Sequence, residues 1–419
     1  MQKHFLHATL LAIVAMMMFA LPQHAQTQEK EAYVVKSDDA KTLTFYYDTQ
    51  KATRPGTKWG IKEKHEKSST PAWAGTDKNP NTTTTQAVIN PSFKEFRPKT
   101  TAEWFNQLQA LTQITGLEHL NTSEVTQMNA MFYGCEALKQ LDVTKFDTQN
   151  VTNMSSMFYD CEALTQLDVS KFNTANVTNM HSMFYHCESL TRLDVSELFN
   201  TKNVTNMGYM FYACKNLPQL DVSKFNTENV TDMSSMFYGC AALTRLDVTK
   251  FKTQNVTDMR YMFGRCDALP QLDVTNFNTE KVTDMCAMFY GCDALTQIDV
   301  NNFDTENVTD MYSMFYGCES LTTIYCNNTW TCGYSEAMFM DCPKLKGVAS
   351  YNKHKTDGTM ANPYTGYFTK KDPAGIAQTG HAATVKAVYS ADGRRLKETQ
   401  PGVNIVKMSD GTTRKVVKK

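Results

Sequence analysis

Twelve cysteines are the most reactive side chains of this 419-residue chain, and eight of them recur at an almost fixed spacing. Each step is 26 residues, except for one of 27 residues between Cys187 and Cys214. Thiols on stacked repeats could bind a metal or form disulfides, because adjacent Cα atoms would lie within bridging distance. However, these side chains would point the same way, and free cysteine is among the most buried residue types. The pattern favours a column of buried reduced thiols: Cys135, Cys161, Cys187, Cys214, Cys240, Cys266, Cys292 and Cys318.

Of the other four cysteines, Cys342 belongs to a final half copy of the repeat, and three stand outside the pattern. Cys286 occupies a position that other repeats fill with residues as different as His181 and Arg260, so we expect an exposed free thiol there. Cys326 and Cys332 are close in sequence and could close a small loop through a disulfide, or remain free.

Seven aspartates recur in register with the cysteines. Like charges directly opposite each other in a sheet are destabilising, so the row needs compensation. Calcium requires six to eight oxygen ligands, and the stretch has no D-x-D-x-D loop. We therefore expect backbone amides and hydroxyls to compensate the aspartates by hydrogen bonds, and a row of bound calcium ions is the alternative. The seven aspartates are Asp142, Asp168, Asp194, Asp221, Asp247, Asp273 and Asp299.

A row of tyrosines follows the repeated phenylalanine and is interrupted once, by Gly264. Tyrosine is amphipathic and suits contact surfaces, but a stacked row at fixed spacing also serves as scaffold. A carbohydrate receptor that uses this row is the alternative function. Its members are Tyr133, Tyr159, Tyr185, Tyr212, Tyr238, Tyr290 and Tyr316.

Catalytic motifs are missing from the sequence. The nine histidines are scattered, with no H-E-x-x-H, G-x-S-x-G or P-loop pattern. With a formal net charge of −1, the sequence lacks the excess of basic residues that is typical of proteins that bind nucleic acid. We therefore expect no enzyme activity, no cofactor, no metal site and no nucleic-acid partner.

The elements that position these rows follow from one repeat. Apolar residues recur at i, i+3, i+6, i+7 and i+10 from Val151 to Cys161, which predicts a helix of about two turns. Leu167 and Val169 then alternate with Asp168, which predicts a short strand. A short helix and a short parallel strand every 26 residues predict an α/β leucine-rich-repeat solenoid, flanked by a small β-rich N-terminal module and a C-terminal tail. Each repeat must bury its apolar face against its neighbours.

The N-terminus has the order of a secretory signal peptide. Lys3 and His4 precede an apolar run from Leu10 to Leu21, and a polar segment follows. The apolar run is too short to span a bilayer. We also expect no membrane span in the chain that remains after the signal peptide is removed. The predicted divisions are a signal peptide at 1–25, a β-rich capping module at 26–98, the solenoid at 99–348, a closing segment and linker at 349–380, and a C-terminal segment at 381–419.

The repeat N-V-T-x-M-x-x-M-F-Y-x-C-x-x-L-T-x-L-D-V resembles that of BspA-like leucine-rich-repeat surface proteins of bacteria. Segments at 31–35, 44–48, 71–73 and 90–93 resemble the N-terminal module of that family, and Gly366-Tyr367-Phe368-Thr369 resembles its closing segment. The resemblance implies a surface-exposed protein that mediates adherence to host proteins or other cells. It brings no catalytic residue.

The last 40 residues resemble the end of type IX secretion sorting domains. The matching segments lie at 388–395, 402–407 and 415–419, although Asn404 stands where an aromatic residue is usual. A small terminal β-cap is the alternative. The resemblance implies the secretion machinery as a partner, and export to the surface of a Gram-negative bacterium.

These observations predict a non-catalytic, surface-displayed adhesin that contacts a host extracellular or bacterial surface protein or glycan. Repeated residues build the scaffold, so specificity should lie where the copies differ. The predicted ligand contacts at such positions are His181, Arg192, Tyr209, Arg245 and Arg260.

Overall fold

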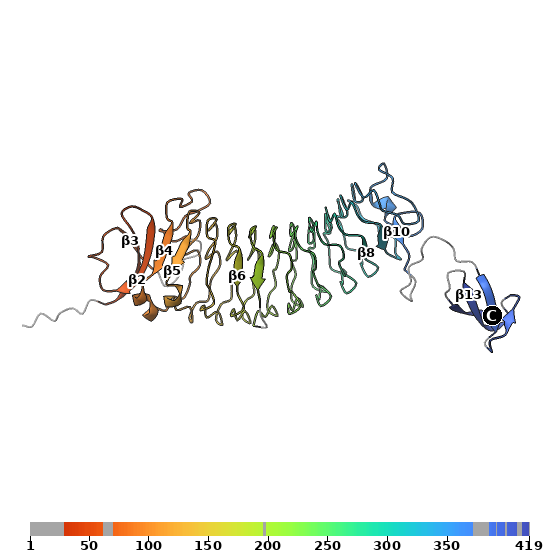
Figure 1. Ribbon diagram of the computed structural model, residues 1–419, viewed down its shortest axis with the longest axis horizontal. Helices are drawn as coiled ribbons and strands as arrows, with labels where there is room; N and C mark the ends of the chain where they lie inside the picture. Colours follow the sequence, from red (N-terminus) through yellow and green to blue (C-terminus); the bar gives the residue numbers. More distant parts are fainter. Residues whose placement is uncertain are drawn as a thin grey trace, which may run out of the picture.

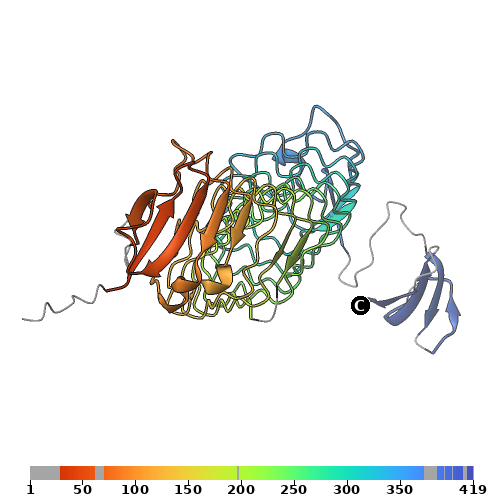
Figure 2. The ribbon, with the colours of Figure 1, turned by 60° about the vertical axis from the view of Figure 1, so that its left-hand side comes forward.

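The computed structural model describes residues 29–61, 70–195, 198–371, 385–390, 392–398, 400–408 and 413–418. Stacked coils form an elongated solenoid, with a β-sheet at its N-terminal end and an aromatic closing segment at the other (Figures 1 and 2). The predicted signal peptide, 1–25, lies outside the described residues. In the part of the chain that is described, no helix is long and apolar enough to cross a membrane.

The N-terminal sheet covers the first coil. Its strands, in the order β3-β1-β2-β4-β5, are β1 (Glu31–Lys36), β2 (Thr42–Asp48), β3 (Thr57–Gly60), β4 (Gln86–Ile89) and β5 (Gln113–Thr115). β1 is antiparallel to β2 and β3, whereas β4 is parallel to β2 and β5. Of two 3₁₀ helices, η1 (Pro91–Glu95) lies between β4 and β5, and η2 (Leu117–His119) follows β5. Phe45 of β2 stacks on Trp104 of the first coil at 5.5 Å, so the sheet seals that end of the core.

The segment predicted as a short helix in each repeat forms a run of turns instead. Its amides alternate between two kinds of bond: the Met157 N–H closes a turn on the Met154 carbonyl (3.3 Å), and the Phe158 N–H donates to the Met183 carbonyl of the next coil (2.9 Å). Left-handed backbone at Ser156 (φ 54°) and Asp160 (φ 53°) makes this alternation possible. The helix prediction was wrong because a three-residue apolar spacing fits successive turns as well as a helix. An isolated two-turn helix is marginal, whereas turns free alternate amides to bond the next coil.

The parallel strand forms at the predicted position in several coils. β6 (Gln166–Asp168) pairs with β7 (Arg192–Asp194). Near the other end, β8 (Gln297–Asp299) pairs with β9 (Thr323–Tyr325), and β9 pairs with β10 (Phe368–Thr369). Coils between these pairs are joined by single parallel bridges, such as Gln219–Arg245.

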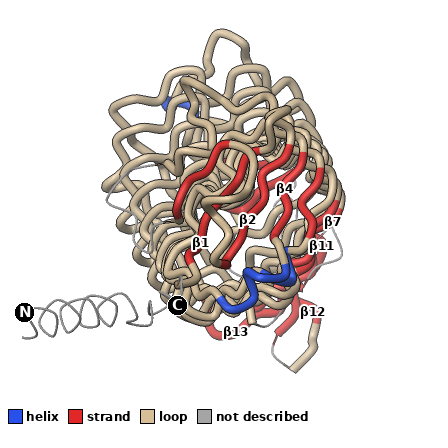
Figure 3. The backbone as a smooth tube through the Cα atoms, turned by 90° about the vertical axis from the view of Figure 1, so that its left-hand side faces the viewer, coloured by secondary structure: helices blue, strands red, loops and turns tan. Residues whose placement is uncertain are grey.

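Figure 3 views the stacked coils end-on, and each coil places the same side chains in one continuous core. The repeated phenylalanines stack on each other, with Phe132 and Phe158 centroids 5.7 Å apart. The cysteine column is fully buried, and the Cys161 thiol donates to the Phe132 carbonyl of the preceding coil (3.3 Å). Burial raises the pKa of Cys161 well above its ordinary value. These thiols are therefore scaffold groups that also satisfy backbone acceptors.

The C-terminal end of the solenoid is closed by aromatic residues. Trp330 stacks on Phe303 at 6.1 Å and meets the edge of Phe368 of β10 at 4.9 Å. A short 3₁₀ helix, η3 (Gly358–Met360), lies in the same segment. Of the two alternatives for Cys326 and Cys332, the structure has free thiols, and their Sγ atoms face different carbonyls.

A separate four-stranded antiparallel sheet lies in the C-terminal segment. Its order is β12-β11-β13-β14, with β11 (Val385–Ser390), β12 (Arg395–Leu396), β13 (Gly402–Met408) and β14 (Thr413–Lys418). Val388 and Val406 form its small core with Leu396. Asn404, at the position where an aromatic residue was expected, is buried and bonds the Gln400 and Gly402 carbonyls.

Candidate binding surfaces

The five predicted contact residues lie on two different surfaces of the solenoid. Arg192 and Arg245 share one repeat position beside the parallel strands, which we call the strand face. His181, Tyr209 and Arg260 lie on the run of turns, which we call the turn face. All five are exposed or half-buried, but no single site contains them all.

The strand face is hollowed where four successive coils meet the closing segment, and we call this hollow the strand-face groove. Its volume is about 610 Å³. Apolar side chains form its floor, and amides, hydroxyls and charged groups surround them. The lining residues are Thr244, Arg245, Leu246, Asp247, Thr249, Pro270, Gln271, Leu272, Asp273, Thr275, Gln297, Ile298, Asp299, Tyr325 and Lys371.

The aspartate row runs along this groove and is satisfied by local hydrogen bonds. The Asp247 Oδ1 accepts from the Thr249 hydroxyl (2.6 Å) and amide (3.0 Å), and these two bonds lower the pKa of Asp247. Lys371, from the closing segment, pairs with Asp299 at 2.5 Å. Among the described residues, the side chains whose ligand atoms cluster closely enough for a metal lie elsewhere. This geometry supports the hydrogen-bonded interpretation of the row over the calcium ladder.

A second aspartate row runs along the turn face. The Asp284 Oδ1 accepts the Cys286 amide at 2.9 Å, and the same bond recurs at Asp232, Asp258 and Asp310. These acids therefore close turns on the turn face. Burial raises the pKa of Asp258 and Asp284, although Arg260 lies 3.2 Å and 3.9 Å from them and lowers both values.

The other predicted residues of the turn face contact each other. His181 meets the Tyr209 ring edge-on at 5.5 Å, and its Nδ1 lies 3.3 Å from Asn206 Oδ1. Cys286, expected to be exposed, is half-buried, and burial raises its pKa to about 11. Its thiol is therefore poorly ionised at neutral pH.

The tyrosine row forms a stacked column. Neighbouring rings lie 4.4 Å apart at Tyr133–Tyr159 and 4.2 Å apart at Tyr159–Tyr185, and the stacking continues to Tyr238. Burial raises the pKa of Tyr133 to about 12. Within the column each ring face is covered by the next ring, which leaves edges and hydroxyl groups for other contacts.

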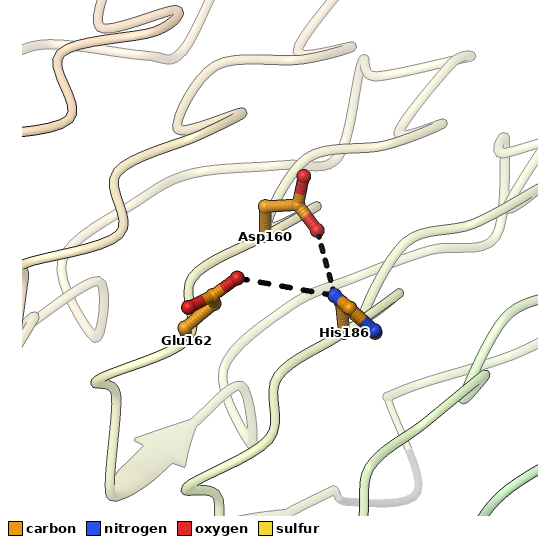
Figure 4. A group of neighbouring side chains, drawn as sticks. All are labelled: Asp160, Glu162 and His186. Carbon is orange, nitrogen blue, oxygen red and sulfur yellow. Dashed lines mark ion pairs between the residues drawn. The ribbon is translucent and has the colours of Figure 1, made fainter.

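Asp160, Glu162 and His186, on adjacent coils, form a cluster that the repeat pattern did not predict (Figure 4). His186 Nδ1 lies 3.2 Å from Asp160 Oδ1 and 3.9 Å from Glu162 Oε1. Burial raises the pKa of Asp160 to about 6, although His186 lowers it. One feature of the sequence could have indicated this cluster. The position before the core cysteine is glycine in several copies, including Gly134 and Gly239, but it is Asp160 and His186 in these two coils.

The chain is similar to a leucine-rich cell surface protein from Faecalibacterium prausnitzii A2-165, at 15% identity and a TM-score of 0.28, over 71% of this chain and 93% of that one. It is also similar to a leucine-rich repeat protein from Eubacterium ventriosum ATCC 27560, at 15% identity and a TM-score of 0.34, over 87% of this chain and 97% of that one. These superpositions are too loose to add to the fold described above. No curated protein matches the chain.

A family model described as "Mycoplasma protein of unknown function, DUF285" matches residues 99–198, 191–273 and 242–351. These matches together cover the whole run of repeats and more than half of the 419 residues. The chain therefore belongs to the DUF285 family.

Proposed function

We propose that this protein is a non-catalytic binding protein, displayed on the cell surface, that holds a protein ligand in the strand-face groove. The observation that carries the proposal is the groove itself, in which the repeats stop being equivalent. Arg245, Tyr325 and Lys371 line it at positions where neighbouring coils carry other residues or where the closing segment joins the coils.

The scaffold is suited to presenting such a groove. One continuous hydrophobic core extends from Ala32 to Phe368, and neighbouring coils are joined by backbone hydrogen bonds. A rigid surface loses little conformational entropy when it binds, which favours affinity. The groove therefore offers a preformed surface.

The chemistry of the groove matches an extended polypeptide. The Gln271 and Gln297 side-chain amides can donate to and accept from a peptide backbone, and both are exposed. Arg245 can pair with an acidic side chain, and Asp273 can pair with a basic one. Arginine and tyrosine are also enriched among residues that dominate binding energy.

The stacked tyrosines argue against the carbohydrate alternative. Aromatic side chains that bind sugars offer a free ring face, whereas the faces along this column are covered by neighbouring rings at 4.2–4.9 Å. The column is better suited to supporting the turn face than to holding a glycan.

Display on the cell surface is part of the same proposal. We propose that residues 1–25 direct export and that 381–419 act as a sorting segment of a Gram-negative bacterium. The test is cell fractionation of the full chain and of a chain shortened at residue 380. Loss of surface exposure in the shortened chain would support the sorting role, and unchanged exposure would contradict it.

The binding test compares two arginines of equal charge on different faces. The purified chain is first screened against host extracellular-matrix proteins and whole bacterial cells, and the strongest ligand is kept. We expect Arg245→Ala to weaken its binding about tenfold or more, because arginines in interface centres often contribute over 1 kcal/mol. The matched control Arg260→Ala, on the turn face, should change the Kd less than twofold.

Three results would contradict the proposal. They are the absence of any ligand in the screen, a loss of binding in Arg260→Ala with Arg245→Ala unaffected, and a glycan as the sole ligand. Thermal unfolding of both variants shows that each remains folded.

A further inference from the structure

The repeat position directly before the core cysteine has left-handed backbone throughout the described coils. Glycine occupies it in four coils, at Gly134, Gly239, Gly291 and Gly317. Two adjacent coils instead carry Asp160 and His186, at φ 53° and 57°. The strain alone does not identify a site, because Ala213 and Arg265 share this conformation. What distinguishes Asp160 and His186 is the arrangement of their ligand atoms.

The three side chains of the cluster already converge (Figure 4). All three ligand atoms lie within 4.8 Å of one another, with the Nδ1 of His186 3.2 Å from Asp160 Oδ1 and 3.9 Å from Glu162 Oε1. Two ligands of a tetrahedral zinc ion, each bound at about 2.1 Å, are about 3.4 Å apart. The two observed distances bracket this value. Glu162 is exposed and can complete the geometry by a change of rotamer.

The histidine ring is held from its other side. Its Nε2 lies 3.3 Å from the Glu188 Oε1, which also accepts from Lys215 Nζ at 2.6 Å. A metal-binding histidine usually donates its second ring N–H to a carboxylate, which fixes the tautomer and the ring orientation. Glu188 is placed to accept that proton, and this leaves the Nδ1 lone pair directed at Asp160 and Glu162.

The cluster also has an excess of carboxylates. The carboxylates of Glu162 and Glu136 both lie close to that of Asp160. Lys215 is already paired with Glu188. A bound cation would therefore offset repulsion among these acids.

We propose that Asp160, Glu162 and His186 bind one divalent transition-metal ion of the zinc class, with Glu188 as a positioning residue. Imidazole with carboxylates suits zinc and its neighbours better than calcium or magnesium, which prefer oxygen ligands. The ion would tie two adjacent coils together, and three protein ligands leave a coordination position for water or an external ligand. This site lies on the turn face and does not depend on the strand-face groove.

The test is calorimetric titration of the untagged full chain with ZnCl₂ after dialysis against a chelator. We expect one ion per chain with a Kd in the micromolar range. His186→Gly and Asp160→Gly should each weaken binding at least tenfold. Both variants introduce the residue that other coils carry at this left-handed position, so folding should be preserved, and thermal unfolding verifies this. Zinc should also raise the melting temperature of the unaltered chain but not that of His186→Gly.

The matched control alters the other group among the described residues that could hold a metal ion, formed by Asp284, Cys286 and Asp310. Cys286→Ser places the residue found at Ser155 and Ser234, and it should bind zinc as the unaltered chain does. No binding by the unaltered chain up to about 100 µM zinc would overturn the proposal. So would unchanged affinity and stoichiometry in His186→Gly, or loss of binding in Cys286→Ser.

Discussion

Asp247 and Asp284, on opposite faces of the solenoid, have pKa values shifted in opposite directions. Asp247 on the strand face is exposed and accepts two hydrogen bonds from Thr249, which lower its pKa. Asp284 on the turn face is half-buried, and burial followed by the charge of Asp310 raises its pKa. Ionised Asp247 therefore stabilises the fold at neutral pH, whereas ionised Asp284 destabilises it.

This difference predicts the effect of Asp284→Asn. The amide oxygen can still accept the residue-286 N–H, as Asn179 accepts that of His181 at 2.9 Å. Because the folded pKa of Asp284 is raised, its protonation on acidification favours the folded state. We expect the variant to melt about 1–2 °C higher than the unaltered chain at pH 7. The gain should vanish below the ordinary aspartate pKa of 3.8, where both chains are neutral at this position.

Differential scanning calorimetry between pH 7 and pH 3.5 measures the Asp284→Asn effect. Asp247→Asn is the control of opposite sign, since it should melt lower than the unaltered chain at pH 7. A lower melting temperature for Asp284→Asn at pH 7 would contradict the proposed repulsion.

Buried threonines join neighbouring coils at one corner of each repeat. The Thr253 hydroxyl donates to the Asn278 carbonyl of the next coil and accepts the Asn278 amide, both at 2.8 Å. The same donor bond recurs along the solenoid, at Thr122, Thr148, Thr174, Thr201, Thr227 and Thr279. The buried Thr253 hydroxyl therefore serves a backbone donor and a backbone acceptor at once.

Thr253→Val should be strongly destabilising although it preserves shape. It removes the hydroxyl and leaves the partly buried amide and carbonyl of Asn278 without this partner, at up to about 1–3 kcal/mol for each unsatisfied group. We expect the free energy of unfolding in urea to fall by about 2–4 kcal/mol. Thr253→Ser keeps the hydroxyl and should lose less than half as much. Equal losses in the two variants would assign the effect to packing instead.

At the scale of the whole molecule, both ends of the hydrophobic column are sealed by aromatic residues. Trp104 and Phe45 cover the first coil, and Trp330 lies between Phe303 and Phe368 at the last. In a solenoid each coil contacts only its neighbours, so loss of a seal should open the adjacent coils first. The stability of the protein is thus expected to be lowest where a seal is weakened.

Trp330→Ala tests this view. Truncation of a buried tryptophan costs about 3–5 kcal/mol, and here the loss should fall on the C-terminal coils. We expect amide hydrogen exchange to accelerate over residues 297–345, while protection over 125–195 is unchanged. Hydrogen exchange measured by mass spectrometry resolves the two regions. Uniform acceleration along the chain would show that the solenoid unfolds as one cooperative unit.

The period of the repeat, the residues of the core and the scaffold role of the cysteines could all be predicted from the amino-acid sequence. A 26-residue repeat allows few ways to bury the same apolar positions, so Phe158, Cys161 and Leu164 are buried as their spacing predicts. The alternation of apolar and polar residues also predicted correctly that Asp168 follows buried Leu167 on a short strand.

The hydrogen bonding between successive coils could not be predicted from the repeat pattern and is seen only in the folded chain. The turns in place of helices depend on alternate amides that reach residues 25 positions away, such as Phe158 to Met183. The strand-face groove and the Asp160–His186 cluster are likewise formed between coils, from residues that no local pattern connects. Spacing within a repeat specifies what is buried, whereas contacts between repeats decide backbone geometry and bring chemically distinct side chains together.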